Sequence, residues 1–250
     1  MIKTIDGAIR VAMADLYYLK RNILTVLITV LVLPLLYFIS FAYGLGSTVD
    51  ETEGVTYIAF VIPGIISLST LSSCFSTTAN KIMLQRRFYS SFDEIILCPV
   101  SSISVVLGKC ILGIIRGLLC STVLIVLGLL MTDDFLITPM LLVTILLSCL
   151  TYCLLGVVAG FLVKGVPTFN LFNSLVILPM TFLCGTVFSV SAMPGFLQVI
   201  IAFLPLSHTT NCIRSAALGW EFPWISLVLI IIYGLLFLIV SKYLLDKGRV

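Results

Sequence analysis

The side chains of this sequence that could do chemistry form none of the common catalytic patterns. Gly108 and Lys109 stand together as in a phosphate-binding loop, but the upstream glycine and the following serine or threonine are missing. The HExxH and GxSxG patterns do not occur either. The only histidine, His208, is a better candidate for a structural or interfacial residue than for a catalyst. We therefore expect no catalytic site in this chain and no cofactor bound by it.

The eight cysteines are candidates for metal ligands or disulfides: Cys74, Cys98, Cys110, Cys120, Cys149, Cys153, Cys184 and Cys212. Most lie inside apolar runs, where a free thiol acts as a small hydrophobic side chain. Cys149 and Cys153 share a helix face, but no histidine or carboxylate stands nearby to complete a metal site. We predict no metal site. A disulfide between Cys184 and Cys212 stays open, because both fall on the side assigned below as outer.

Charged side chains are nearly missing from the long apolar runs. Carboxylates of the kind that relay protons or bind Na⁺ in a membrane occur in none of them. Arg116 is the sole charge well inside such a run, where a basic residue costs about 2.5–3.5 kcal/mol. It follows Lys109 by about two turns, so it can snorkel to the cytoplasmic face; a headgroup or substrate contact is the alternative. A protein that moves something without such carboxylates should take its energy from a partner.

Uncharged polar side chains are concentrated in two of the apolar runs. The second half of the run 55–80 carries Ser67, Ser69, Thr70, Ser72, Ser73, Ser76, Thr77 and Thr78. In lipid, small polar groups stabilise helix packing, and they can also line a path for a substrate. Both interpretations stay open. The residues that we select for a path, three of them from the run 168–190, are Ser69, Ser73, Ser76, Thr77, Asn170, Asn173 and Thr181.

The composition places these residues in a lipid environment. Of 250 residues, 60% are hydrophobic and 10% are charged, and the mean hydropathy is +1.24. A soluble domain carries about 25% charged residues. The apolar runs are continuous and do not alternate as in a β-barrel, which predicts an all-α polytopic membrane protein with one transmembrane domain, 1–250. The net charge of +3 is spread along loop ends and indicates no nucleic-acid partner.

The apolar runs predict six transmembrane helices, at about 23–43, 55–80, 105–131, 136–163, 168–190 and 223–245. Gly156 and Gly160 form a GxxxG pattern, which allows close helix approach within one copy. The longest charged connection is 81–109. Residues 191–222 predict a re-entrant helical hairpin, because their apolar run is too short to span, and Ser207 is a possible cap of its second helix.

Residues 1–22 predict a helix along the membrane surface before the first span. Their apolar residues recur with a helical period at Ile2, Ile5, Ile9, Met13 and Leu16. No small-residue cleavage site follows, so we do not expect a signal peptide.

Basic residues decide the orientation of the six spans. An even number of spans puts both termini on one side, and that side would hold Lys3, Arg10, Lys20, Arg21, Lys81, Arg86, Arg87, Lys109, Lys164, Lys242, Lys247 and Arg249. The opposite side would hold only Arg214. Cytoplasmic loops carry the excess of Lys and Arg, so we predict cytoplasmic termini in a cytoplasmic (plasma or inner) membrane.

Two segments resemble the type-2 ABC transporter permease family, and the match covers essentially the whole chain. The first is RFYSSFDEIILCPV at 87–100, followed by Gly108-Lys109. The second is FLCGTVF at 182–188, followed by Met193-Pro194, LPLSH at 204–208 and Arg214. A Gly-Thr pair, which often precedes the family's Glu, reads Phe92-Asp93 here.

The resemblance implies a division of labour between subunits. Two permease copies would pair in the bilayer, and each would dock an ATP-binding cassette ATPase subunit that carries ATP and Mg. The loop between spans two and three would supply a coupling helix at about 86–98. Its polar contacts would be Arg86, Arg87, Asp93 and Glu94, its apolar contact Phe92, and Pro99 would end it. A path would run between the copies, lined by spans one, two and five, under an outer gate that includes Pro194, Pro205, His208 and Arg214.

We therefore expect the transmembrane subunit of an ATP-driven exporter of an amphipathic, lipid-like, drug-like or glycan substrate. The alternative is a non-transport membrane scaffold or assembly subunit with an ATP-binding partner. Substrate identity and the choice between homodimer and heterodimer stay open, and direction rests on the family alone.

Overall fold

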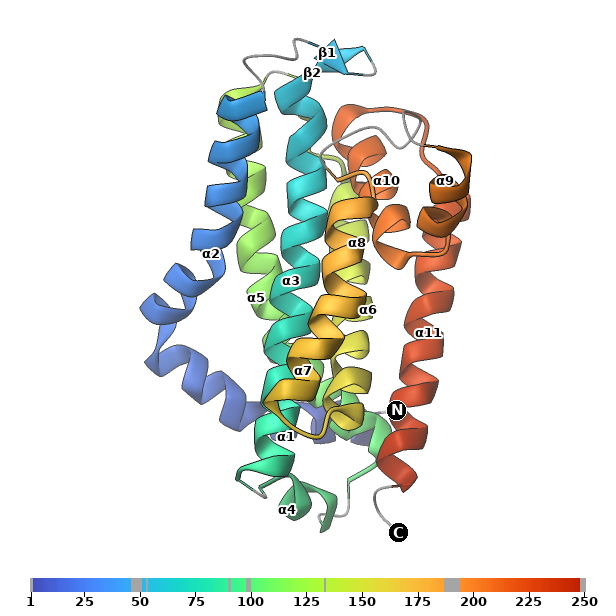
Figure 1. Cartoon of the computed structure of the whole chain (residues 1–250). Helices are drawn as coiled ribbons and strands as arrows, with labels where there is room; N and C mark the ends of the chain where they lie inside the picture. Colours follow the sequence, from blue (N-terminus) through green and yellow to red (C-terminus); the bar gives the residue numbers. More distant parts are fainter. Residues whose placement is uncertain are drawn as a thin grey trace.

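Long helices run side by side through most of the chain (Figure 1). This computed structural model describes residues 2–45, 51–52, 54–89, 91–97, 100–132, 134–186 and 194–247. In chain order its elements are α1 Ile2–Arg21, α2 Ile23–Ile39, the π-helical segment η1 Ser40–Leu45, β1 Glu51–Thr52, β2 Val55–Thr56, α3 Tyr57–Arg87, α4 Ser91–Leu97, α5 Ser102–Met131, α6 Pro139–Leu162, α7 Val166–Phe172, the π-helical segment η2 Asn173–Ile177, α8 Leu178–Leu183, α9 Gly195–Ala202, α10 Pro205–Leu218 and α11 Trp224–Lys247.

Five helical runs of the described chain are each long and apolar enough to cross a membrane: α3, α5, α6, the run α7–η2–α8 and α11. Two bent pairs also qualify, α1 with α2 at 85° and α9 with α10 at 89°, which raises the possible number to seven. The predicted all-α polytopic class is confirmed. Each of the six predicted spans overlaps a helix or helical run, since α2 and η1 together cover 23–45. How many of them cross the bilayer stays a prediction.

Helix α3 is the centre of the bundle. Of its most apolar 18-residue window, 83% is buried, against 17% for α11, which lies at the edge. Glycines let neighbours approach α3 closely, because a Cβ at Gly156 of α6 would stand 2.9 Å from the carbonyl oxygen of Phe75. A Cβ at Gly160 would stand 2.8 Å from Cβ of Ile82. The GxxxG pattern thus packs within one copy, as the sequence predicts.

Gly64 marks another close approach, between α3 and the turn that follows α8. A Cβ at this position would stand 1.7 Å from the carbonyl oxygen of Thr186. Gly64→Ala should therefore displace this turn and lower the free energy of unfolding by about 1–3 kcal/mol or more. Gly195→Ala is the control, because among the described residues nothing lies within 4 Å of its new methyl group. Equal unfolding midpoints of the two variants in detergent would contradict the prediction.

The two ends of the bundle differ in charge and construction. Helix α1, helix α4 and the last turn of α11 lie at the same end, called here the basic end (Figure 1). The strands β1 and β2 and the pair α9–α10 lie at the opposite end. Helix α10 begins at Pro205 rather than Ser207, and the Ser207 hydroxyl donates to the Ile201 carbonyl at 2.8 Å. The predicted Ser207 cap is therefore wrong, because this side chain is used to tie α10 back to α9.

The described cysteines are buried free thiols. Cys184 lies in the turn after α8 and Cys212 lies in α10. The alternative of a disulfide between them is therefore not formed in this structure.

Candidate functional site

The row of hydroxyl side chains on α3 is divided between the core and a groove. In the core, Ser67 lies 3.0 Å from the hydroxyls of both Thr209 and Thr210 of α10. Tyr152 of α6 bonds to the Thr209 hydroxyl as well. These contacts join three helices, so this part of the row stabilises packing.

Other members of the row line a groove of about 220 Å³ between α2, α3 and α5, called here the hydroxyl groove. Its opposite wall, on α2, includes Thr29, Val30, Leu33, Pro34 and Tyr37. Its α3 wall is made by Leu68, Ser69, Ser72, Ser73, Ser76 and Thr77. The four α3 residues selected for a path therefore lie together, while the passage of a substrate there stays a prediction.

A second and larger cavity of about 510 Å³ continues the first one toward the basic end, and it is called here the basic groove. Its walls include Tyr18 of α1, Leu112 of α5 and the α3 residues Asn80, Lys81, Leu84, Gln85 and Tyr89. Both grooves share Ser76, Thr77 and Arg116, so they are continuous. The larger volume lies in the range of about 300–1,000 Å³ that is usual for small-molecule sites.

Arg116 stands where the two grooves meet. Its Nη1 donates to the Thr77 hydroxyl at 3.3 Å, and its Nε is buried without a hydrogen-bond partner among the described residues. The side chain therefore faces the cavities of the bundle. Both alternatives for Arg116, snorkelling and a headgroup or substrate contact, stay predictions.

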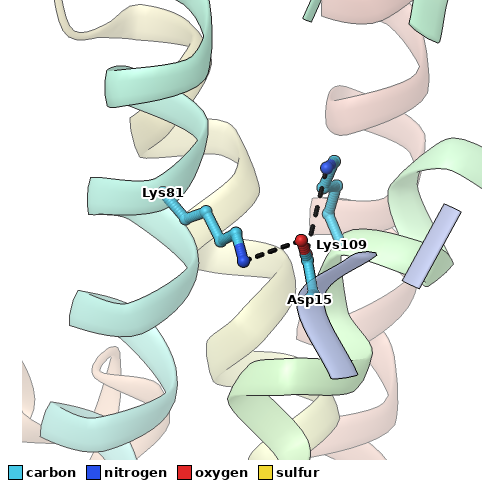
Figure 2. A network of polar contacts seen from close by, with 3 residues as sticks. All are labelled: Asp15, Lys81 and Lys109. Atoms are coloured by element: carbon cyan, nitrogen blue, oxygen red, sulfur yellow. Dashed lines mark ion pairs between the residues drawn. The ribbon is translucent and has the colours of Figure 1, made fainter. Parts of the chain in front are cut away.

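A buried ionic cluster fixes α1 beside the basic groove (Figure 2). Asp15 of α1 is 2% exposed, and its Oδ1 lies 2.7 Å from Nζ of Lys81 on α3. Its Oδ2 lies 3.9 Å from Nζ of Lys109 on α5, which is 4% exposed. Lys81 also stands 5.7 Å from the ring centre of Tyr18. One carboxylate thus serves two ammonium groups and ties three helices together.

Sequence reasoning missed this cluster because it followed the large apolar residues of α1. Ile9 and Met13, which belong to that stripe, are 46% and 47% exposed. The buried stripe is instead Ala8, Ala12, Asp15 and Leu19. Spacings of four, three and four residues put these side chains on one helical face, and a carboxylate among small apolar residues was the signal that could have found it.

The predicted path residues of the fifth span lie elsewhere. Asn170 is exposed on α7, whereas Asn173 and Thr181 are half-buried, and none of the three lines either groove. Helix α7 packs on α3 through the Phe75 ring, which stacks with Phe169 and Phe172 at 6.2 and 5.7 Å. Within one copy, the two halves of the predicted path are therefore not brought together.

The segment predicted to dock an ATPase is anchored to the bundle. Nη1 of Arg86 donates to the Phe161 carbonyl of α6 at 2.9 Å, and its guanidinium lies 4.8 Å from the Phe161 ring centre. Phe92 of α4 is fully buried, edge-on to the same ring at 5.5 Å. Phe92 therefore holds α4 against α6, and its role as an apolar docking contact stays a prediction.

The surface that this segment offers at the basic end is formed by other side chains. Arg87 and Glu94 are exposed. Leu97 is 86% exposed, and Phe88 and Tyr89 are 59% and 71% exposed. The side chain of Asp93 and all of Pro99 lie outside the described residues.

The residues predicted for an outer gate gather at the opposite end and are mostly fixed by packing. Pro194 is exposed just before α9, and Pro205 is the buried first residue of α10. A ring nitrogen of His208, Nε2, lies 2.9 Å from the Ala202 carbonyl. Arg214 is 6% exposed, and its Nη2 donates to the Gly185 carbonyl at 2.9 Å. This supports a structural role for His208; gating stays a prediction.

Comparison with known proteins adds an independent finding. Residues 10–218 match the family model described as ABC-2 type transporter. "Nodulation protein J" of Rhizobium meliloti is 29% identical over 187 residues, which cover 74% of this chain and 71% of that protein. "Nodulation protein J" of Bradyrhizobium diazoefficiens is 29% identical over 186 residues, or 74% and 71%. "Inner membrane transport permease YadH" of Escherichia coli is 24% identical over 218 residues, or 86% and 84%.

Proposed function

Because the chain belongs to the ABC-2 type transporter family, we propose that it is the transmembrane subunit of an ATP-driven exporter. It moves an amphipathic, lipid-like, drug-like or glycan substrate out across the cytoplasmic membrane. It lies there as a multi-pass protein with six spans and both termini in the cytoplasm. Similarity to an inner membrane transport permease over 86% of the chain supports this membrane. The concentration of basic side chains at the end with α1, α4 and the end of α11 supports the orientation.

The energy for transport comes from a separate ATP-binding cassette subunit, which holds ATP and Mg. The observation that carries this proposal is helix α4, a short helix that projects at the basic end and is clamped to α6 through Phe92. A clamped helix transmits a push from a docked ATPase to the spans, whereas a loose loop would absorb it. Glu94 and Leu97 of α4, together with Arg87 at the end of α3, form the exposed docking surface, and Pro99 and Asp93 belong to the same segment.

Two permease copies form the working unit, and the substrate path runs between them. The hydroxyl groove opens on one side of α3, while Asn170 and Asn173 lie on the α7–η2–α8 run. A second copy would be needed to close these separate polar faces into one path. Pro194, Pro205, His208 and Arg214 frame its outer end.

The docking surface is tested by charge reversal. The double variant Arg87→Glu, Glu94→Lys should lower the amount of ATPase that co-purifies with the permease by about tenfold or more, equal to about 1.4 kcal/mol. Both side chains are exposed, and the unfolding midpoint of the variant is measured beside co-purification to separate docking from folding. Lys247→Glu, an exposed charge at the end of α11, is the control and should leave co-purification unchanged.

Two outcomes would count against the proposal. Co-purification of the double variant at the wild-type level would show that these side chains at α4 are not the docking surface. A wild-type complex whose ATPase activity responds to no amphipathic substrate in vesicles would favour a membrane scaffold over an exporter.

A further inference from the structure

The basic groove carries more positive than negative charge. Lys81 and Arg116 line it, and no Asp or Glu occurs among its lining residues in the described chain. Behind the Lys81 wall, Asp15 faces both Lys81 and Lys109. Asp15 therefore serves Lys81 and Lys109, and among the described residues no carboxylate forms an ion pair with Arg116. A partly buried cation without a counter-charge is stabilised when an anion binds beside it.

The groove also presents donors that a bound anion can use. Arg116 donates one N–H to the Thr77 hydroxyl, and its buried Nε has no hydrogen-bond partner in the part of the chain that the structure describes. The side-chain amide of Asn80 and the phenol of Tyr18 lie in the same walls. A guanidinium with free N–H groups binds phosphate or carboxylate oxygens in pairs, and a nearby ammonium adds a point charge.

A groove with both apolar and hydroxyl side chains continues from the anion end of the cavity. The hydroxyl groove begins at the shared residues Ser76, Thr77 and Arg116 and continues along α2. There it is bordered by Val30, Leu33, Pro34 and Leu68 as well as by hydroxyls. A polar, positive cavity that leads into a half-apolar groove matches a molecule with an anionic head and an apolar tail.

We infer that the basic groove binds the phosphate or carboxylate headgroup of an anionic amphiphile, and that this amphiphile is the substrate class of the transporter. Its head lies between Lys81 and Arg116, and its apolar part follows the hydroxyl groove between α2 and α3. This inference rests on the proposed transport function. It deepens that function, because the family assignment names no head chemistry.

Binding is tested on the purified full-length permease without an ATPase. The probes are fluorescent phosphatidic acid and fluorescent phosphatidylcholine with the same acyl chains. Phosphatidic acid should bind about tenfold more tightly than the zwitterionic lipid, and Arg116→Gln should remove about that tenfold preference. Arg116→Lys keeps the charge but loses the planar guanidinium with its paired N–H donors, so it should lose less of the preference for phosphatidic acid. Lys242→Gln, an exposed cation of α11, should leave the preference unchanged.

The outcomes separate the possible sources of the anion. Equal affinity for the two lipids, or an unchanged preference in Arg116→Gln, overturns the inference. Displacement of phosphatidic acid by inorganic phosphate alone would make the ligand a soluble anion and overturn the assignment to an amphiphile. Binding of phosphatidic acid that inorganic phosphate does not displace supports the assignment to an amphiphile.

A second measurement connects binding to transport. In vesicles that contain the complex with its ATPase, the anionic lipid should stimulate ATP hydrolysis by the wild type and not by Arg116→Gln. Stimulation that persists in Arg116→Gln, or lipid binding without any stimulation, would make the bound lipid a structural component and overturn the substrate assignment. Docking of the ATPase is measured separately with the Arg87→Glu, Glu94→Lys variant, so failure of this inference and failure of the proposed function are distinguishable.

Discussion

Replacing Asp15 by asparagine should lower the free energy of unfolding by about 3–5 kcal/mol, the usual cost of removing one partner from a buried ion pair. The change leaves the ammonium groups of Lys81 and Lys109 without their carboxylate, although Asp15 and Lys109 are only 2% and 4% exposed. An asparagine fits the same space, so the loss is electrostatic rather than steric. The measurement is the unfolding midpoint of the purified protein in detergent.

A matched control lies on the same helix. Asp6 pairs with Arg10 at 3.1 Å, but the two side chains are 60% and 76% exposed. Asp6→Asn should cost no more than about 0.5 kcal/mol, because an exposed i,i+4 pair contributes little. Equal losses for Asp6→Asn and Asp15→Asn would show that burial of the cluster does not matter.

A second variant distinguishes the charge from the shape of the cluster. Lys109→Met removes one buried cation and keeps a long apolar side chain. In the double variant it should therefore restore part of the stability that Asp15→Asn loses. The effects of the single variants should therefore fail to add by about 0.5–3 kcal/mol, as is usual for side chains in contact. Strict additivity would contradict the view that Asp15 balances Lys109.

Removing the guanidinium of Arg214 should also lower the free energy of unfolding by several kcal/mol, about 2–6 kcal/mol for Arg214→Met. Its Nη2 donates to the carbonyls of Gly185 and Thr186 at 2.9 and 3.3 Å. Its Nε donates to the Phe60 carbonyl of α3 at 3.3 Å, and the guanidinium lies 3.7 Å from the Phe60 ring centre. Arg214→Met leaves two turn carbonyls without this donor, so we expect a loss of about 2–6 kcal/mol at about 1–3 kcal/mol for each.

The thiol of Cys184 reports on the same turn. It is 2% exposed beside Gly185, so a maleimide should label it slowly in the wild type and faster in Arg214→Met. Peptide mass spectrometry separates this label from the labels on other cysteines. Arg214→Lys keeps the charge but not the planar guanidinium, so its rate of Cys184 labelling should lie between those of the wild type and Arg214→Met. Arg87→Met removes an exposed guanidinium and should change neither unfolding nor labelling. Unchanged labelling in Arg214→Met would mean that the turn is held without Arg214.

The sequence alone determined the solvent and the helices. The continuous apolar runs predicted an all-α membrane protein because a chain with 60% hydrophobic residues needs lipid around it. The glycines at 156 and 160 predicted close packing inside one copy, since local spacing defines a helix face before any partner is known. The motif at 87–100 indicated the family, which the match over residues 10–218 then established.

Only the tertiary structure decided which polar side chains share a space. Asp15, Lys81 and Lys109 are far apart in the chain, and no local period relates them, so their pairing follows from how α1 crosses α3 and α5. The hydroxyls of α3 look alike in sequence, yet Ser67 is used for packing and Ser73 faces a groove. Phe92 is buried because its ring packs edge-on against Phe161 of α6. Periodicity records which face of a helix is apolar, whereas the identity of the neighbour depends on contacts between distant segments.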